Sequence, residues 1–406
     1  MYPRLKKLFA IKGYSLFVIC VLLVGIGISI TQPYLSLYAT EDLGMSVGAF
    51  GVFMAVSSLS GVVVNSLIAK RSDGGLDRKW LIIIAMISSA LGYASYLVFH
   101  NFIILMIVIT LFNGLGAPAM PQIYASAQES ANASQNDDKT FAMSTLRSLV
   151  SLGFLIGPLV GTFILGTLGY KGLFLGTSAI YLTIASLVFL FLQKRKSVQR
   201  NDRKIKSTGT FSLKNRQIML PFISFIFLFA VNAINGINTP LFIVNELRGT
   251  HTDVALVVGI SAGLEIPIML LLGALGRNIS NHSLMMFGCF VALIYYTFLS
   301  ISTQSWQLIA AQLLQATYVA IVMGNGLSYF TDLLPGSPGM STTIYYNRSI
   351  IGRLVGNMGG GMIAQFIGFR HVYWACLAIV IFSMFILWRT KPHEEVEITT
   401  GHTGSA

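Results

Sequence analysis

The chain has 406 residues, of which 54% are hydrophobic and only 10% are charged, and its mean hydropathy is +0.72. Soluble globular domains contain about 25% charged residues, and a chain this apolar would expose large sticky surfaces in water, so its natural solvent is lipid. The net charge of +12 does not indicate nucleic-acid binding, because the basic residues stand in short runs between apolar stretches.

Long apolar stretches follow one another along nearly the whole chain. A membrane-spanning helix needs about 20 mostly apolar residues, and about twelve stretches meet that length. The first begins after MYPRLKK without a convincing cleavage site, so we interpret it as a spanning helix and not as a removed signal peptide. The expected helices are 14–40, 46–69, 80–99, 102–126, 141–167, 172–192, 217–244, 253–275, 283–301, 305–330, 341–367 and 370–388.

A long polar stretch divides these helices into two sets. We expect an N-terminal six-helix bundle at 1–192, a cytoplasmic linker at 193–216, a C-terminal six-helix bundle at 217–392 and a disordered tail at 393–406. Several polar positions recur at similar places in the two sets, such as Gln32-Pro33 and Thr239-Pro240. The fold class is therefore all-α and integral to the membrane, with two pseudo-symmetric halves and a site between them.

The distribution of basic residues predicts the orientation. With the N-terminus inside, 21 of the 27 Lys and Arg residues fall in cytoplasmic segments and three in outside loops. The positive-inside rule then places both termini in the cytoplasm of a multi-pass protein in the bacterial inner membrane.

The segment between the second and third expected helices reads Ala69-Lys-Arg-Ser-Asp73-Gly-Gly-Leu-Asp77-Arg78-Lys79. It resembles the signature loop of the major facilitator superfamily, although Ala69 replaces the usual Gly and the basic pair comes one residue late. The resemblance implies a tight turn and a charge cluster, with Asp73 and Arg78, that locks the cytoplasmic side. The alternative is an ordinary loop that follows the positive-inside rule.

The fifth expected helix contains Gly153-x-x-x-Gly157-Pro158-x-x-Gly161. Small residues at this spacing let helices approach closely, and Pro158 removes a backbone donor and bends the helix. Generic helix packing is one explanation of this pattern. It also resembles the antiporter motif of facilitator exporters, with Thr162 in place of the last Gly, and this resemblance favours efflux.

A more specific resemblance is spread over nearly the whole chain. The chain resembles the bacterial sugar efflux transporter family in Gln32-Pro-Tyr-Leu-Ser-Leu-Tyr38, Ala69-Lys-Arg-Ser-Asp73, Ala119-Met-Pro-Gln122, Ala262-Gly-Leu-Glu-Ile-Pro267 and Tyr373-Trp374. This resemblance implies proton-driven export of mono- or disaccharides and related glycosides. The implied partners are a small sugar, protons and membrane lipid, and we expect a monomer.

The polar residues inside the expected helices suit a neutral polyol, which needs many hydrogen-bond partners and a flat aromatic face. Asn and Gln also bond between helices as packing glue, and we expect about half to do so. The polar side chains at such depth are Gln32, Tyr34, Asn113, Gln122, Asn232, Asn235, Asn238, Gln312, Gln315, Tyr318, Asn325, Tyr345, Tyr346 and Asn347. Those that we expect to contact the substrate are Gln32, Asn113, Gln122, Asn235, Asn238, Tyr318, Asn325 and Tyr346.

Glu265 is the acid expected deepest in the membrane, roughly 18 Å into the eighth helix. An ionised carboxylate is strongly disfavoured there, so we expect Glu265 to take up and release the coupling proton. Pro267 frees the backbone carbonyl of Gly263 beside it. The alternatives are that Glu265 bonds to the sugar or stays protonated as interhelical glue.

Two arginines lie roughly 9 Å inside their helices on the cytoplasmic side. We expect Arg147 to pair with Glu129 and Arg348 to pair with Asp332, as symmetric ion pairs that form and break with the inner gate. The alternative is that both arginines reach the lipid headgroups.

Other chemistry is not indicated. The sequence has no GxxxxGK[ST] loop, its six histidines lack metal-ligand spacing, and its three cysteines lie in apolar spans. We therefore expect no cofactor, no metal and no enzymatic activity. The rival functions are a multidrug/proton antiporter of the same fold and, from another class, a transporter-like membrane sensor or a polytopic membrane enzyme.

Overall fold

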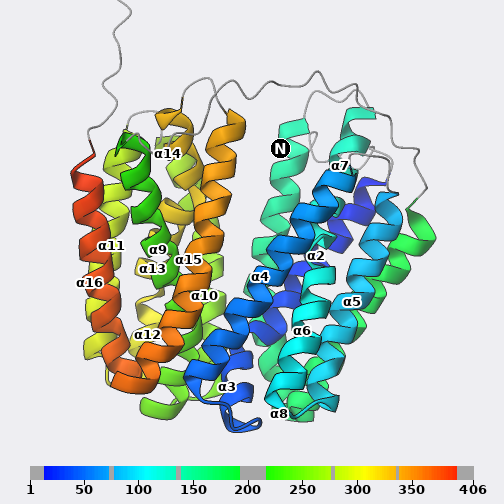
Figure 1. Cartoon of the computed structure of the whole chain (residues 1–406), viewed down its shortest axis with the longest axis horizontal. Coiled ribbons are helices and arrows are strands. Elements are labelled where there is room, and N and C mark those ends of the chain that lie inside the picture. The colour runs from blue at the N-terminus through cyan, green and yellow to red at the C-terminus, as the bar shows by residue number, and fades with distance from the viewer. Residues whose placement is uncertain are drawn as a thin grey trace, which may run out of the picture.

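The computed structural model describes residues 13–72, 77–133, 139–192, 216–275, 279–334 and 338–390. Nearly all of the expected linker, the expected tail and Asp73 lie outside these ranges, and so does the side chain of Arg147. The described residues are almost entirely helical, and the helices run side by side across the molecule (Figure 1). The expectation of an all-α fold is confirmed.

The first half of the chain forms one bundle, on the right of Figure 1. Its elements are α2 (Tyr14–Thr31), η1 (Gln32–Tyr34), α3 (Leu35–Glu41), α4 (Val47–Ser72), α5 (Arg78–Val98), α6 (Phe102–Gly116), α7 (Ala119–Ala133) and α8 (Lys139–Phe191).

The second half forms the other bundle, on the left of Figure 1. Its elements are α9 (Arg216–Leu241), η2 (Phe242–Glu246), α10 (His251–Leu275), α11 (Asn281–Ile301), α12 (Ser305–Ala310), α13 (Gln312–Val319), η3 (Ala320–Gly324), α14 (Gly326–Leu333), α15 (Pro338–Ile367) and α16 (Phe369–Trp388).

Within the described ranges, 10 helical segments are long and apolar enough to cross a membrane. One of them belongs to α8, whose 53 residues contain a break at Gly169, where φ is 64°. This left-handed conformation suits glycine, and it divides α8 into the two helices that were expected on either side of it. The 30-residue α15 is not among the ten, because its Tyr-Tyr-Asn-Arg-Ser run and Arg353 make it less apolar. All the expected segments nevertheless fall on described helices.

Each half is held together by a close helix crossing built on glycine. In the first half, α8 crosses α2, and a Cβ added at Gly153 would lie 2.7 Å from the Cα of Gly25. In the second half, α15 crosses α9, and a Cβ added at Gly356 would lie 2.3 Å from the carbonyl oxygen of Ala230. The glycine pattern that suggested an antiporter motif is thus used for packing in the described structure, and the second half repeats it.

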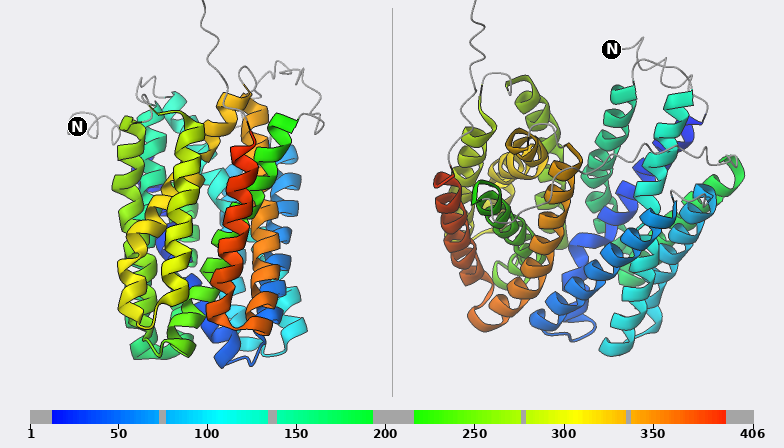
Figure 2. Two further views of the ribbon diagram at one scale, coloured as in Figure 1. Left: turned by 90° about the vertical axis from the view of Figure 1, so that its left-hand side faces the viewer. Right: turned by 45° about the horizontal axis from the view of Figure 1, so that its top comes forward.

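The two halves meet at the end of the molecule away from the described chain ends. There α4 packs against α15: the amide of Gly48 donates to Oε1 of Gln365 at 3.1 Å, and the backbones of Gly51 and Asn357 are in close contact. α8 also packs against α10. The right-hand view of Figure 2 shows the two bundles diverging away from the end at which they meet.

Candidate functional site

A cavity of about 760 Å³ lies between the two halves. Its lining comes from α2, η1, α3, α4, α5, α6 and α8 of the first half and from α9, η2, α10, α13, η3 and α15 of the second. On α15 the lining residues run from Asn357 near mid-helix to Tyr345 nearer the helix start. The cavity therefore extends from the end at which α4 packs against α15 toward the opposite side of the membrane.

Neutral polar side chains from both halves line this cavity. Of the residues expected to bind substrate, the structure places Gln32 and Asn113 there from the first half and Asn235 and Tyr346 from the second. The side chains of Gln32 and Asn113 form no hydrogen bond with any described residue, and both are exposed to the cavity. These groups are available to a ligand that offers hydroxyl groups.

Asn235 is held in place by its neighbours. Its Oδ1 accepts hydrogen bonds from Thr239 at 2.9 Å and from the hydroxyl of Tyr295 at 3.4 Å. No described residue accepts a hydrogen bond from its amide nitrogen. Because the acceptor side is occupied, Asn235 presents a donor to the cavity. Close by, Gln315 donates to Oδ1 of Asn232 at 3.2 Å, and both residues also line the cavity.

Three of the expected substrate residues, Gln122, Asn238 and Asn325, lie outside the lining, and their polar atoms bond to other parts of the protein. Gln122 accepts a hydrogen bond from Arg78 at 2.9 Å. Asn238 donates to the carbonyl oxygen of Phe369 at 2.8 Å, and Asn325 donates to Oδ1 of Asn281 at 2.6 Å. These three side chains hold helices together, which was the alternative for amides at this depth.

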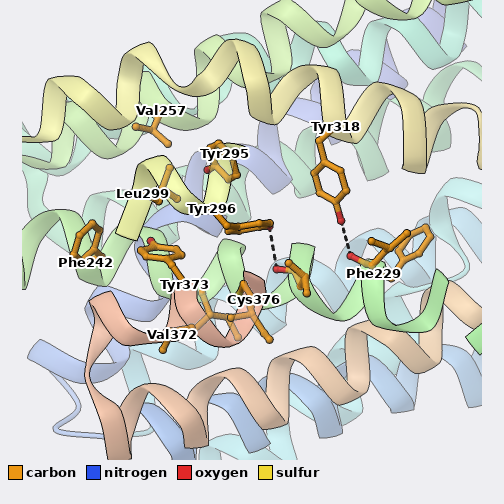
Figure 3. Close-up of a cluster of buried hydrophobic side chains, with 14 of the residues drawn as sticks. Phe229, Phe242, Val257, Tyr295, Tyr296, Leu299, Tyr318, Val372, Tyr373 and Cys376 are labelled. Carbon is orange, nitrogen blue, oxygen red and sulfur yellow. Dashed lines mark hydrogen bonds between the residues drawn. The ribbon is translucent and has the colours of Figure 1, made fainter. Parts of the chain in front are cut away.

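Tyr318 is also outside the lining. It is fully buried, and its hydroxyl donates to the carbonyl oxygen of Leu228 at 2.8 Å (Figure 3). Figure 3 shows it beside a cluster of further tyrosines, Tyr295, Tyr296 and Tyr373, inside the second half. It cannot stack on a ligand in the cavity in this conformation, whereas Tyr346 is 54% exposed and lines it.

Glu265 lies in the lining, as the sequence suggested. It is about 21 Å along α10 from His251 at about 1.5 Å per residue, which is near the middle of a membrane. It is the one carboxylate among the described lining residues, and no described residue forms a hydrogen bond or ion pair with it. The carboxyl group is therefore free to exchange a proton or to contact a ligand.

Two of the expected gate residues form an ion pair with each other in this conformation. Nε of Arg78 forms an ion pair with Oε1 of Glu129 at 2.9 Å, both within the first half. The side chain of Arg147 is outside the described residues, so its pairing with Glu129 stays a prediction. The pair between Arg348 and Asp332 is not formed in this conformation, and the carboxylate of Asp332 accepts a hydrogen bond from Asn281. Because the expected pair forms and breaks with the inner gate, it stays a prediction.

Arg348 lies in an aromatic cage. Its guanidinium carbon is 3.8 Å from the centroid of Phe225, 4.1 Å from that of Tyr345 and 4.3 Å from that of Phe330. The side chain is fully buried, and its two terminal nitrogens form no hydrogen bond with the described residues. Cation–π attraction to aromatic rings on three helices takes the place of the expected acid partner in this conformation.

Sequence reasoning assigned no role to Arg353, which the structure places in the cavity lining together with Asn357. The signal was present: Arg353 is a charged residue at mid-helix depth, which is the same criterion that singled out Glu265.

Comparisons with known proteins agree with this architecture. The model of the Major Facilitator Superfamily matches residues 17–304 and 222–404. A protein of Dickeya chrysanthemi named sugar efflux transporter A is 30% identical over 380 residues, which cover 93% of this chain and 95% of that protein. The chain belongs to the sugar efflux transporter family of the Major Facilitator Superfamily. It is thus a multi-pass membrane protein of a transporter family.

Two further likenesses also extend over most of the chain. The multidrug resistance protein MdtG of Proteus mirabilis is 25% identical over 385 residues, which cover 90% of this chain and 92% of that protein. The crystal structure of the nucleoside transporter NupG superposes with a TM-score of 0.80 at 14% identity, over 92% of this chain and 97% of that one. The latter likeness concerns the fold alone.

Proposed function

We propose that this protein exports small sugars or glycosides across the bacterial inner membrane as a proton antiporter. The observation on which the proposal depends is the central cavity, where neutral amides from both halves surround a single described carboxylate, Glu265. Amides and hydroxyls match the hydrogen-bonding groups of a polyol. A family relative named for sugar efflux supports the same substrate class.

The transport cycle in this proposal is alternating access. With both termini in the cytoplasm, as the basic residues predict, the cavity faces the cytoplasm and the contact of α4 with α15 closes the outer side. A sugar enters from the cytoplasm and bonds to Gln32, Asn113 and Asn235. The halves then close at the cytoplasmic side and open outward, and the sugar leaves.

Glu265 couples this cycle to protons in the proposal. Its carboxyl group takes up a proton from the outside once the sugar has left, and a protonated carboxyl is the favoured form in a poorly hydrated site. After return to the inward-facing state the proton is released to the cytoplasm, and the carboxylate can then accept a hydrogen bond from a sugar hydroxyl. Sugar and proton thus occupy the site in turn.

The direct test is transport into everted membrane vesicles, whose lumen corresponds to the outside of the cell. A panel of radiolabelled mono- and disaccharides and glycosides is offered, and a pH jump makes the lumen acidic. We expect at least one compound to accumulate, and an ionophore that dissipates the proton gradient should prevent its accumulation. No accumulation of any compound would refute sugar export, and accumulation that resists the ionophore would refute proton antiport.

A multidrug/proton antiporter is the second candidate, because a multidrug resistance protein is 25% identical to this chain over most of its length. The same vesicles distinguish the two functions when ethidium replaces the sugar. Accumulation of ethidium without accumulation of any sugar would favour the second candidate.

A further inference from the structure

Arg353 is an exposed cation in the middle of the central cavity. It lies about 22 Å along α15 from Pro338 at about 1.5 Å per residue, so it is near mid-membrane depth. Its side chain is exposed because it faces the cavity. The side chain of Arg353 forms no hydrogen bond, ion pair or ring contact in the part of the chain that the structure describes.

Three other described arginines have their charges compensated within the protein. Arg78 pairs with Glu129, Arg370 pairs with Glu246 at 2.7 Å, and the aromatic cage holds Arg348. Among the described lining residues Arg353 is the one cation, and it forms no ion pair with Glu265. A charged group at this depth is energetically costly, and such a residue usually marks a functional site. The cavity is where Arg353 can contact a solute.

A fixed guanidinium has two effects on what enters such a cavity. At an effective dielectric constant of about 20, like charges about 8 Å apart repel strongly enough to lower affinity roughly thirtyfold. The same planar group has five N–H donors in a fork, which can bond to two adjacent oxygen atoms. Repulsion of the wrong solute and attraction of the right one are the two ways in which a site becomes specific.

We propose that Arg353 determines the specificity of the cavity: it excludes organic cations and donates hydrogen bonds to adjacent hydroxyl oxygens of a neutral polyol. This inference rests on the proposed sugar export and adds a residue that separates it from multidrug export. Glu265 alone would attract cations, whereas Glu265 together with Arg353 leaves the cavity without net negative charge.

The test compares Arg353→Gln and Arg353→Lys with wild type in everted vesicles. The two solutes are ethidium, a monovalent organic cation, and the neutral sugar that wild type transports fastest. Arg353→Gln should transport ethidium about tenfold faster or more, because the repelling charge is gone. Arg353→Lys should still exclude ethidium but should raise the KM for the sugar, because an ammonium group lacks the fork. Lys171→Gln, at an exposed position of α8 outside the cavity lining, is the matched control and should change the transport of neither solute.

The outcomes separate this inference from the proposed function. If wild type exports sugar and Arg353→Gln gains no ethidium transport, the inference is wrong and sugar export stands. If no variant exports sugar but Arg353→Gln gains ethidium transport, sugar export is wrong and cation exclusion by Arg353 stands.

A measurement on wild type covers the case in which Arg353→Gln does not fold. Uncharged phenanthridine should inhibit wild-type sugar export at a concentration at least about tenfold lower than ethidium does. Equal inhibition by the charged and uncharged compounds would overturn the exclusion of cations.

Discussion

In the first half, α8 crosses α2 through Gly153, and in the second half α15 crosses α9 through Gly356. The residues that line the cavity are not duplicated in this way. From the first half the cavity receives neutral groups such as Gln32 and Asn113, whereas Glu265 and Arg353, the charges among its described lining residues, both come from the second. The duplicated part is the scaffold, and a single half contributes the charges. The proposed coupling and selectivity can therefore be changed without disturbing the fold.

The largest effect should follow from Glu265→Gln, which removes the one carboxylate among the described lining residues. Gln mimics the protonated carboxyl group and cannot release a proton. We expect uphill, gradient-driven export to fall to the level of vesicles that lack the protein, while sugar exchange between equal pools continues. Both are measured with radiolabelled sugar in everted vesicles.

The matched control for this prediction is Glu41→Gln, at an exposed position at the end of α3. It should retain uphill export. Persistent uphill export in Glu265→Gln would show that another group transfers the proton.

A smaller effect, equal in the two halves, is expected from the helix crossings. Gly153→Ala and Gly356→Ala each place a methyl group closer than 3.0 Å to backbone atoms of the partner helix. Such overpacking should lower the free energy of unfolding by about 1–3 kcal/mol. It can be measured by denaturant unfolding of the purified protein in detergent micelles.

Gly166→Ala and Gly359→Ala serve as controls, because a Cβ at either position has no atom within 4 Å. They should unfold like wild type. If one crossing tolerates Ala and the other does not, the packing of the two halves is not equivalent.

A weaker effect is expected at the neutral sugar contacts. Asn113→Ala in the first half and Asn235→Ala in the second should each weaken sugar binding about three- to tenfold, since a neutral hydrogen bond contributes about 0.5–1.5 kcal/mol. Isothermal titration with the exported sugar measures this. Asn325→Ala should bind like wild type, because Asn325 bonds to Asn281 outside the cavity. Wild-type affinity in both cavity variants would contradict the assignment.

The smallest effect is expected from Asp332→Asn. Asp332 is exposed and bonded to Asn281 instead of Arg348, and the amide oxygen of Asn can accept the same hydrogen bond. The ratio of inward to outward accessibility, measured by cysteine labelling, should stay within about twofold of wild type, as for other exposed charges. A large shift in this ratio would show that Asp332 is part of the inner gate.

The sequence predicted the helices well because each spanning helix is a long apolar run, and even the break at Gly169 falls between two expected helices. The site was predicted less well, because position along a helix gives depth but not direction. Asn235 and Asn238 are three residues apart, yet one faces the cavity and the other bonds to Phe369. Likewise Arg348 and Arg353, five residues apart on α15, point to an aromatic cage and to the cavity.

At the end of the molecule where the two halves meet, no ion pair between described residues joins them. There the halves touch through glycine backbones, the amide of Gly48 with Gln365, and the rings of Tyr34 and His251, whose centroids are 6.1 Å apart. Within the described ranges no ion pair joins one half to the other; Arg78–Glu129 and Arg370–Glu246 each stay within one half. Dissolved ions weaken attraction between exposed charges but hardly affect close packing of uncharged groups. In the proposed transport cycle, the rate at which this end opens should therefore be nearly the same at low and at high salt concentration, an advantage where the ionic strength of the external medium changes.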